Sequence, residues 1–398
     1  MIVGAADVVI VGASAAGLFV AELLARGGMR VRLFDAGAAA PLPRTLIVTA
    51  RLFDALGFVP TEAIVNRLRS VQLVSPNRTT VVAMKEPDLV VERAAILRVL
   101  RERAIEAGAE IFAGFRFVGM RAAPGGAVLS LRDVKRDVVV DVTAARVVGA
   151  DGGFSRVAKC VERRVRDTVP IVQAVVTLPP GANAEQARVW FDPAVTPYFF
   201  WSIPESCERA AVGLIAQDGR TAKDALERFL TSMGLTPLEL QAARVPLFHR
   251  SPRPFARVGE SEIYLTGDAA GQVKVTTVGG LVTGLRGGRA VADAILKGLP
   301  YDKTLQALDR ELAVHRWVRL LLNRFRPEDY DQLLDLLDGP TRAHLGAYTR
   351  DELARTFLRL IMTQPRLLRF VLRVLTPWSG GNGTTSRKVD TFAASPIR

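Results

Sequence analysis

Two glycine-rich loops, separated by most of the chain, constrain the fold more than any other feature. The first runs from Gly12 to Gly17 and the second from Thr266 to Gly280. Each follows an apolar run typical of a strand and precedes a segment with helical spacing. A helix N-terminus directs backbone N–H groups at electron-rich ligands, so a phosphate suits the first loop and a polarised ring suits the second. The pair therefore predicts a site for the two ends of one long cofactor.

The first loop lies in a predicted β-α-β unit. A β-branched strand, Val8 to Val11, precedes it, a helix follows from Leu18, and a second strand ends at Asp35. Dinucleotide-binding folds place an acid at this distance to bind a ribose hydroxyl. Ser14 stands where the fingerprint has a glycine that lets the backbone approach a pyrophosphate, and a small side chain is compatible with that approach. As a bare pattern, the same loop could be an ordinary tight turn.

The rest of the chain predicts two further regions. Residues 44–58 and 92–107 have helical spacing, residues 129–131 and 138–142 have strand character, and alternating runs fill residues 168–250. After residue 300 the pattern is helical to about residue 375. We therefore expect an α/β fold that comprises a discontinuous Rossmann-like domain at 1–165 and 255–298, an antiparallel-sheet substrate domain at 166–254, and a C-terminal helical region with a flexible tail at 299–398.

Composition limits the partners. A net charge of +13 favours an anionic partner, whereas a mean hydropathy of +0.20 is more typical of a protein that binds an apolar ligand than of a nucleic-acid binder. The two cysteines, Cys160 and Cys207, cannot form a disulfide framework, and the three histidines are scattered, so we expect no metal site. We find neither a signal peptide nor an apolar run long enough to span a membrane, and we expect a cytoplasmic monomer that does not bind nucleic acid.

The C-terminal region has a basic, leucine-rich segment. Arg366, Arg369 and Arg373 recur at helical spacing among leucines and a phenylalanine. Such a helix could lie on an anionic membrane surface, which would make the protein peripheral on the cytoplasmic face. It could equally be the solvated edge of a packed terminal helix, and the sequence leaves both interpretations open.

Three motifs stand in the order found in FAD enzymes with a para-hydroxybenzoate-hydroxylase-like fold. They are the first loop, Gly149-Ala150-Asp151-Gly152 with Ser155, and Thr266-Gly267-Asp268-Ala269-Ala270. Within that superfamily, Gly267 to Lys274 followed by Thr276-Thr277 and Gly279-Gly280 resembles the geranylgeranyl reductase family, which reduces isoprenoid double bonds with flavin. The segment Phe199 to Pro204, with Gly213 downstream, is similar to that family's aromatic-x-Trp-x-aliphatic/aromatic-Pro motif.

The resemblance implies a set of FAD-binding residues. The pyrophosphate would meet the first helix, Asp35 the adenosine ribose, and Asp268 the ribityl or pyrophosphate-linked part. The second helix would begin beside the flavin N1 and C2 carbonyl and stabilise the reduced, anionic ring. Arg93 would offer a cationic fork, although a solvated arginine is the alternative. The complete set is Gly12, Ser14, Ala15, Ala16, Gly17, Asp35, Arg44, Arg93, Gly267, Asp268, Gly279, Gly280 and Leu281.

A possible substrate wall lies in the Trp-containing segment. On a strand, Phe199, Trp201 and Ile203 share one face, which could be plain core or the wall of a cavity. With the flavin motifs present, we favour the cavity. Lys274 could contact substrate or flavin, or be exposed, and we assign no catalytic acid. The chain departs from the family in having Phe199 for tyrosine, Val275 for proline and no cysteine near residues 41–45.

The resemblance implies an FAD-dependent reductase that saturates C=C bonds of a geranylgeranyl-type isoprenoid or isoprenoid lipid by hydride transfer from flavin N5. The electron donor, NAD(P)H or ferredoxin, is undetermined. An FAD-dependent monooxygenase or halogenase is the alternative, because the Trp-containing segment also resembles flavin halogenases. The lysine those enzymes need is not evident, since Lys85 lies too close before Arg93. A flavoprotein that modifies tRNA is a third, weaker possibility.

Overall fold

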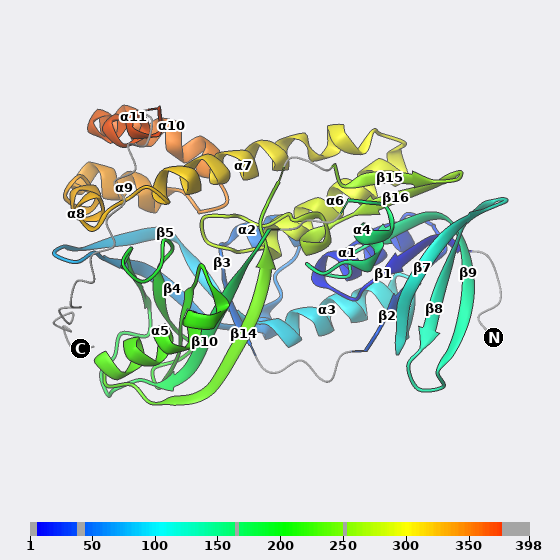
Figure 1. The fold of residues 1–398 in the computed structure, drawn as a ribbon, viewed down its shortest axis with the longest axis horizontal. Coiled ribbons are helices and arrows are strands. Elements are labelled where there is room, and N and C mark those ends of the chain that lie inside the picture. Colours follow the sequence, from blue (N-terminus) through cyan, green and yellow to red (C-terminus); the bar gives the residue numbers. More distant parts are fainter. Residues whose placement is uncertain (1–5, 38–43, 164–166, 250–252, 376–398) are drawn as a thin grey trace. The chain divides into compact units, whose positions relative to one another are not determined.

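The computed structural model describes residues 6–37, 44–163, 167–249 and 253–375, which form two compact units (Figure 1). Unit 1 comprises Met1–Ile64, Val91–Thr168 and Val245–Ala313. Unit 2 comprises Val65–Val90, Val169–Arg244 and Val314–Arg398. The chain therefore crosses between the units several times, and the boundaries differ from those expected. Residues 65–90 were expected in the Rossmann-like domain but belong to unit 2, and residues 299–313 belong to unit 1.

Unit 1 is built on a mostly parallel sheet in the order β15-β16-β9-β1-β2-β6. From β16 to β6 neighbouring strands run parallel, with Val9 beside Arg32 and Val147. Strand β15 pairs antiparallel with β16, and the β7–β8 hairpin pairs antiparallel with β9 through β8. The predicted strands at 129–131 and 138–142 are confirmed as parts of β8 and β9. The bounds are β1 (Ala6–Val11), β2 (Val31–Asp35), β6 (Glu110–Ala113), β7 (Phe115–Ala123), β8 (Gly126–Asp133), β9 (Val138–Gly149), β15 (Phe255–Val258) and β16 (Ser261–Leu265).

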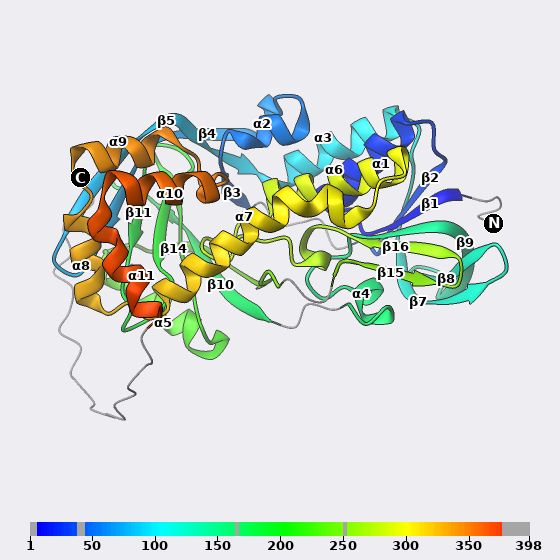
Figure 2. The same ribbon diagram turned by 90° about the horizontal axis from the view of Figure 1, so that it is seen from above.

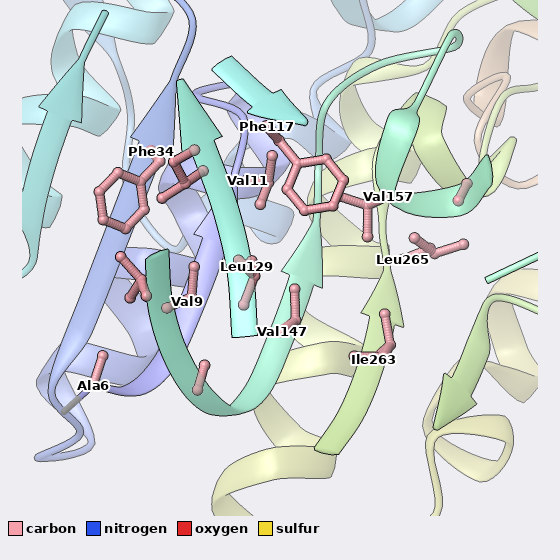
Figure 3. Packing of buried hydrophobic residues seen from close by; sticks show 14 of the residues in the cluster. Ala6, Val9, Val11, Phe34, Phe117, Leu129, Val147, Val157, Ile263 and Leu265 are labelled. Atoms are coloured by element: carbon pink, nitrogen blue, oxygen red, sulfur yellow. The ribbon is translucent and has the colours of Figure 1, made fainter. Parts of the chain in front are cut away.

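The core of unit 1 lies against this sheet (Figure 3). Val9, Val147 and Ile263 come from three adjacent parallel strands and are fully buried. Parallel strands are covered on both faces, which explains why their sequences read as nearly continuous apolar runs. The sheet thus forms a rigid platform whose carboxyl edge carries the loops that follow β1, β2, β9 and β16.

The helices of unit 1 confirm one prediction and correct another. Helix α3 matches the helix predicted at 92–107. The helix predicted at 44–58 is wrong in its first part, because Thr45–Val48 forms strand β3, as its β-branched residues favour, and only Arg51–Leu56 is helical. The bounds are α1 (Ala15–Arg26), α2 (Arg51–Leu56), η1 (Thr61–Ala63), α3 (Arg93–Glu106), α4 (Arg156–Cys160), η2 (Gly267–Ala270), α6 (Leu281–Lys297) and α7 (Tyr301–Leu322), which continues into unit 2.

Unit 2 contains a mixed sheet in the order β14-β10-β13-β12-β11-β4-β5. The pairs among β10, β13, β12 and β11 are antiparallel as predicted, but β11 pairs parallel with β4, so the sheet is not purely antiparallel. Helix α5 covers one face, where Leu226 and Leu230 pack with Val212. The bounds are β4 (Ile64–Val74), β5 (Thr79–Glu92), β10 (Thr168–Thr177), β11 (Gln186–Trp190), β12 (Phe200–Pro204), β13 (Arg209–Ile215), α5 (Gly219–Ser232) and β14 (Pro237–Pro246).

The predicted C-terminal helical region is present. In Figures 1 and 2, α10 and α11 lie outermost, beyond α8 and α9 as seen from the sheet. Helix α9 touches the sheet directly, because a Cβ on Gly346 would lie 1.9 Å from the carbonyl oxygen of Ala83. Within the described part of the chain, no helix combines the length and apolarity needed to cross a membrane. The bounds are α8 (Pro327–Asp335), α9 (Gly339–Ala347), α10 (Leu353–Thr363), η3 (Pro365–Leu367) and α11 (Leu368–Leu375), and the expected tail lies outside the described residues.

Candidate cofactor-binding site

The first glycine loop connects β1 to α1 and leaves no room for side chains at two positions. Gly12 has φ +104°, and a Cβ there would lie 2.5 Å from the carbonyl oxygen of Ala150. A Cβ on Gly17 would lie 2.2 Å from the carbonyl oxygen of Gly12. Both distances are far below van der Waals contact, so glycine is required. The loop backbone can therefore lie directly against the end of β9 and present itself to a ligand.

Ser14 caps the helix that follows this loop. Its hydroxyl accepts a hydrogen bond from the Gly17 N–H at 3.2 Å, and its carbonyl begins the helical hydrogen-bonding pattern with Leu18. The N–H groups of Ala15 and Ala16 precede the first intrahelical bond, so they could donate to an anion together with the positive end of the helix. The serine at the fingerprint's middle position thus serves as the N-cap.

Asp35, at the end of β2, lies beside the same loop. One carboxylate oxygen accepts the Ala13 N–H at 2.9 Å, and the other accepts the Gly37 N–H at 2.9 Å. The carboxylate therefore fixes the loop to the strand end, a role that sequence analysis did not assign. Each carboxylate oxygen retains further acceptor capacity, so this position could also bind a ribose hydroxyl.

The second glycine loop follows β16 and is held by a glutamine. The Gln272 side-chain oxygen accepts hydrogen bonds from the Gly267 N–H at 2.7 Å and the Thr266 hydroxyl at 3.2 Å. The backbone carbonyl of Gln272 accepts one from the Thr283 hydroxyl at 2.5 Å. Tyr301, at the start of α7, donates its hydroxyl to the Leu265 carbonyl at 2.7 Å. Burial raises the pKa of Tyr301, so it remains a neutral donor.

Sequence analysis did not assign roles to Gln272, Thr283 and Tyr301. Gln272 lies inside the segment that carries the family resemblance, and that was the only available signal. The hydrogen bonds of Gln272 and Tyr301 join the second loop to residues 283 and 301. Helical or strand spacing in the sequence does not predict hydrogen bonds of this kind.

The N-terminus of α6 lies beside the N-terminus of α1. Gly280 is the N-cap of α6 and Leu281 its first residue, as predicted. A Cβ on Gly284 would lie 3.4 Å from the Gly267 Cα and 3.8 Å from the Ala16 Cβ, which places both loops at one edge of the sheet. Two helix N-termini therefore meet where the parallel strands end, the position at which open α/β sheets bind ligands.

Three charged residues that are distant in sequence gather beside α6. The Asp268 carboxylate lies 3.0 Å from where a Gly280 Cβ would be. Burial raises the pKa of Asp268 despite the opposing attraction of Arg93 and Arg44. Burial lowers the pKa of Arg44, and repulsion by Arg93 lowers it further. Attraction by Asp268 opposes this shift only in part. The exposed Arg93 begins α3, and its N–H donates to the Arg44 carbonyl at 2.9 Å.

This site fits an extended ligand that bears phosphates and a polar ring. The Arg44 Nε is buried, and the described residues give it no hydrogen-bond acceptor. A buried donor without an acceptor is costly to the free protein, and a ligand such as FAD would supply the acceptor. Among all the residues that the structure describes, no three His, Cys, Asp or Glu side chains lie together in a way that could hold a metal ion.

Lys274 is buried, so the alternative that it is an exposed lysine is wrong. Its backbone pairs with Gly279 across the loop, and its Cε lies 3.4 Å from where a Gly279 Cβ would be. Between them, Val278 has φ +54°, a conformation that β-branched residues rarely adopt. Strain of this kind persists only where the surroundings enforce it. The Lys274–Gly280 loop is therefore held in one shape, which sets where α6 begins.

The Trp-containing segment belongs to unit 2, on β12. Trp201 is buried, Phe199 and Ile203 are half-buried, and the Phe199 and Trp201 rings meet edge to face at 6.2 Å. Trp201 is opposite Gly213 on β13, where a Cβ would lie 2.6 Å from the indole, so this glycine makes room for the ring. The indole N–H is buried with no acceptor among the described residues. Phe200, on the opposite face, packs with α5, which leaves the Trp201 face turned away from that core.

A glycine loop after β1, an acid at the end of β2, and a second loop leading into α6 together define a dinucleotide-binding fold of the flavoprotein type. The FAD binding domain family model matches residues 5–300, and the chain belongs to this family. It is an FAD-dependent oxidoreductase that resembles geranylgeranyl reductases, as the sequence motifs predict, and this prediction is confirmed.

Relatives and solved structures agree with this assignment. Digeranylgeranylglycerophospholipid reductase 1 of Methanothermobacter thermautotrophicus is 28% identical over 302 residues, which cover 71% of this chain and 75% of the relative. The structure of a geranylgeranyl bacteriochlorophyll reductase-like protein from Thermoplasma acidophilum matches with a TM-score of 0.78 at 17% identity, over 93% of this chain and 99% of that one. The flavin-dependent halogenase CmlS matches with a TM-score of 0.67 at 14% identity, over 93% of this chain and 78% of its own. Both structural likenesses show the fold alone.

Proposed function

We propose that this flavoprotein reduces C=C bonds of a geranylgeranyl-type isoprenoid or isoprenoid lipid. The observation that carries the proposal is the apolar face formed by Phe199, which directly precedes β12, and by Trp201 and Ile203 on β12, in a chain whose relatives are named as geranylgeranyl reductases. A polyisoprenoid has almost no polar groups, so an aromatic and aliphatic wall is the surface expected to bind it.

The first loop and Asp35 would hold the adenosine half of FAD. The N–H groups of Ala15 and Ala16 would donate to the pyrophosphate, Gly12 and Gly17 would allow its close approach, and Asp35 would accept a ribose hydroxyl. The Ser14 hydroxyl is occupied in capping α1, so its contribution would be to hold the helix end in place.

The second loop would hold the flavin half. Asp268 would accept hydrogen bonds from the ribityl or pyrophosphate-linked part, and Arg44 and Arg93 would balance nearby negative charge. The N-terminus of α6 at Gly280 and Leu281 would stabilise negative charge on the ring. The buried Lys274 would keep Gly279 and Gly280 in position.

FAD, when bound, supplies the hydride for one alkene carbon, and a proton completes the other carbon. Within unit 2, the Trp201 face would bind the apolar chain of the isoprenoid. We assign no side chain as the proton donor, and NAD(P)H or ferredoxin would re-reduce the protein.

Anaerobic incubation tests the proposal. The FAD-loaded protein is reduced with dithionite and given geranylgeranyl diphosphate or a digeranylgeranyl glycerophospholipid, and products are analysed by mass spectrometry. We expect a gain of two hydrogens per double bond, with heat-denatured protein as the control. No mass gain with any isoprenoid would overturn the substrate class. Oxygen uptake coupled to turnover would instead identify a monooxygenase or halogenase.

A further inference from the structure

The outer faces of α10 and α11 carry large apolar side chains, and the described residues leave these side chains exposed. Leu358 and Met362 on α10 are 64% and 65% exposed, and Leu368 and Leu372 on α11 are 44% and 59% exposed. Within each helix the two residues are four apart and so lie on one face. We call these four residues and the neighbouring Arg366 and Arg369 the C-terminal surface.

The inner faces of the same helices are already packed. Leu360 of α10 and Phe370 of α11 belong to a core cluster with Phe325 and Tyr330. At 100° per residue, Leu358 and Met362 point away from Leu360, and Leu368 and Leu372 point away from Phe370. The exposed residues are therefore not needed to hold the helices in place. Apolar side chains that gather outside a complete core mark an interaction surface.

The charge around this surface has one sign. Residues 353–375 contain five arginines and no aspartate or glutamate. Arg355 has a carboxylate partner, Glu352 at 3.9 Å, but Arg359 contacts the Tyr348 side chain, and Arg369 lies over the Phe370 ring at 4.8 Å. Arg366 and Arg369 are exposed, so their positive charge is accessible to an anionic partner, in a chain whose net charge is +13.

Exposure decides between the two interpretations that the sequence leaves open. A terminal helix with a merely solvated edge would bury its leucines and expose its arginines. On α11, by contrast, Leu368, Leu372 and Arg369 are all exposed. Apolar residues flanked by cations match the acyl and headgroup layers of a bilayer, whereas an acidic protein partner would account for the arginines alone.

We propose that the C-terminal surface docks this protein onto an anionic lipid bilayer. The proposal rests on the proposed function, because an isoprenoid lipid resides in a membrane. A chain of aromatic contacts also connects the two regions: the ring centroids of Phe370 and Phe325 are 4.9 Å apart, those of Phe325 and Tyr330 are 5.1 Å apart, and Tyr330 stacks on Phe191 at 4.6 Å. Phe191 in turn meets Phe199, at the start of the proposed substrate wall, at 6.4 Å. An aromatic core thus joins α11 to β12 within unit 2.

Vesicle co-sedimentation of the FAD-loaded full chain tests the docking. Vesicles of equal parts phosphatidylglycerol and phosphatidylcholine should bind the protein, and pure phosphatidylcholine should bind it much less. Leu358→Ser with Leu372→Ser should weaken binding at least tenfold. Arg366→Gln with Arg369→Gln should weaken it by about fivefold per arginine and reduce its salt dependence. Leu238→Ser is the matched control, since Leu238 is a 60% exposed leucine on β14 of the same unit.

Circular dichroism and FAD content of each variant show whether it is folded, so lost binding can be assigned to the surface. Unchanged vesicle binding in both double variants would overturn the proposal, and so would equal binding to neutral and anionic vesicles. The assay does not require turnover. Docking without isoprenoid reduction would contradict the proposed function alone, and reduction of a dispersed substrate without docking would contradict this inference alone.

Discussion

At the scale of residues, the site depends on backbone positions that exclude side chains and on charges that the free protein leaves unsatisfied. Gly12 combines a positive φ with a carbonyl at 2.5 Å from any Cβ, and Arg44 has a buried Nε without an acceptor. Glycine adopts the first conformation without strain, whereas the unsatisfied Arg44 donor costs stability in the absence of a ligand. Both are features expected of a surface shaped for a bound cofactor.

Gly12→Ala should abolish FAD retention. The added methyl would meet the Ala150 backbone, which cannot move without displacing β9, and the strained φ costs a further ~1–3 kcal/mol. FAD content after gel filtration, read by visible absorbance, measures the effect. Gly28→Ala is the control, because Gly28 also has a positive φ, +83°, but open space around its Cβ. If both variants retain FAD equally, close packing of the first loop is not required for binding.

Asp268→Asn should change how the stability of the FAD-free protein depends on pH. Burial raises the folded-state pKa of Asp268, so its contribution to stability is fully present below the ordinary value of 3.8 and is lost as pH rises through the folded pKa. The asparagine variant stays neutral, so its stability relative to wild type should increase from acid to neutral pH. Urea unfolding at several pH values measures this, and a pH-independent difference would contradict it. FAD affinity should fall in the same variant.

Much of this site was predictable residue by residue, and part of it was not. Gly12, Gly17 and Asp35 follow from local spacing, because the loop and strand end that place them are local, and Asp268 follows from the family resemblance. The burial of Lys274 and the roles of Gln272 and Tyr301 depend on partners that the fold brings from elsewhere in the chain. No local pattern carries that information.

At the scale of elements, the second loop and α6 form one connected structure around Gln272. A Cβ on Gly287 of α6 would lie 1.9 Å from the Gln272 side-chain oxygen, which binds Gly267 and Thr266. Helix α6 can therefore pack against Gln272 and hold the loop only if residue 287 is a glycine.

Gly287→Ala should destabilise the protein by about 1–5 kcal/mol. Displacing the Gln272 side chain leaves two buried donors unpaired, the Gly267 N–H and the Thr266 hydroxyl, at ~1–3 kcal/mol each, against a helix-propensity gain of about 1 kcal/mol. Gly284→Ala, one turn earlier, meets its nearest atom at 3.4 Å and should be neutral or stabilising. Urea unfolding followed by circular dichroism compares the two. Equal stability would show that the Gln272 contacts do not hold the loop.

Element prediction failed where local pattern and tertiary pairing disagree. Residues 45–48 are spaced like part of a helix, yet they form β3, since β-branched side chains favour an extended backbone. Strands β4 and β5 went unpredicted, and the place of β4 in the sheet depends on β11, more than 100 residues later, with which it pairs in parallel.

At the scale of the whole molecule, the chain alternates between a nucleotide-binding unit and a unit that carries an apolar sheet face and amphipathic helices. Composition predicted this combination in outline, because positive hydropathy and high positive charge together suit a protein that binds an apolar and anionic partner. The unit boundaries were not predictable, because residues 65–90 join the second unit through pairing between distant strands.

The most direct measurement follows the reduced flavin of the loaded protein in an anaerobic stopped-flow spectrometer after geranylgeranyl substrate is added. We predict that flavin absorbance returns without oxygen, with one oxidised flavin for each double bond saturated, and that Trp201→Phe slows this step while FAD content stays unchanged. Flavin that remains reduced until oxygen is admitted, with product that then contains oxygen, would contradict the account.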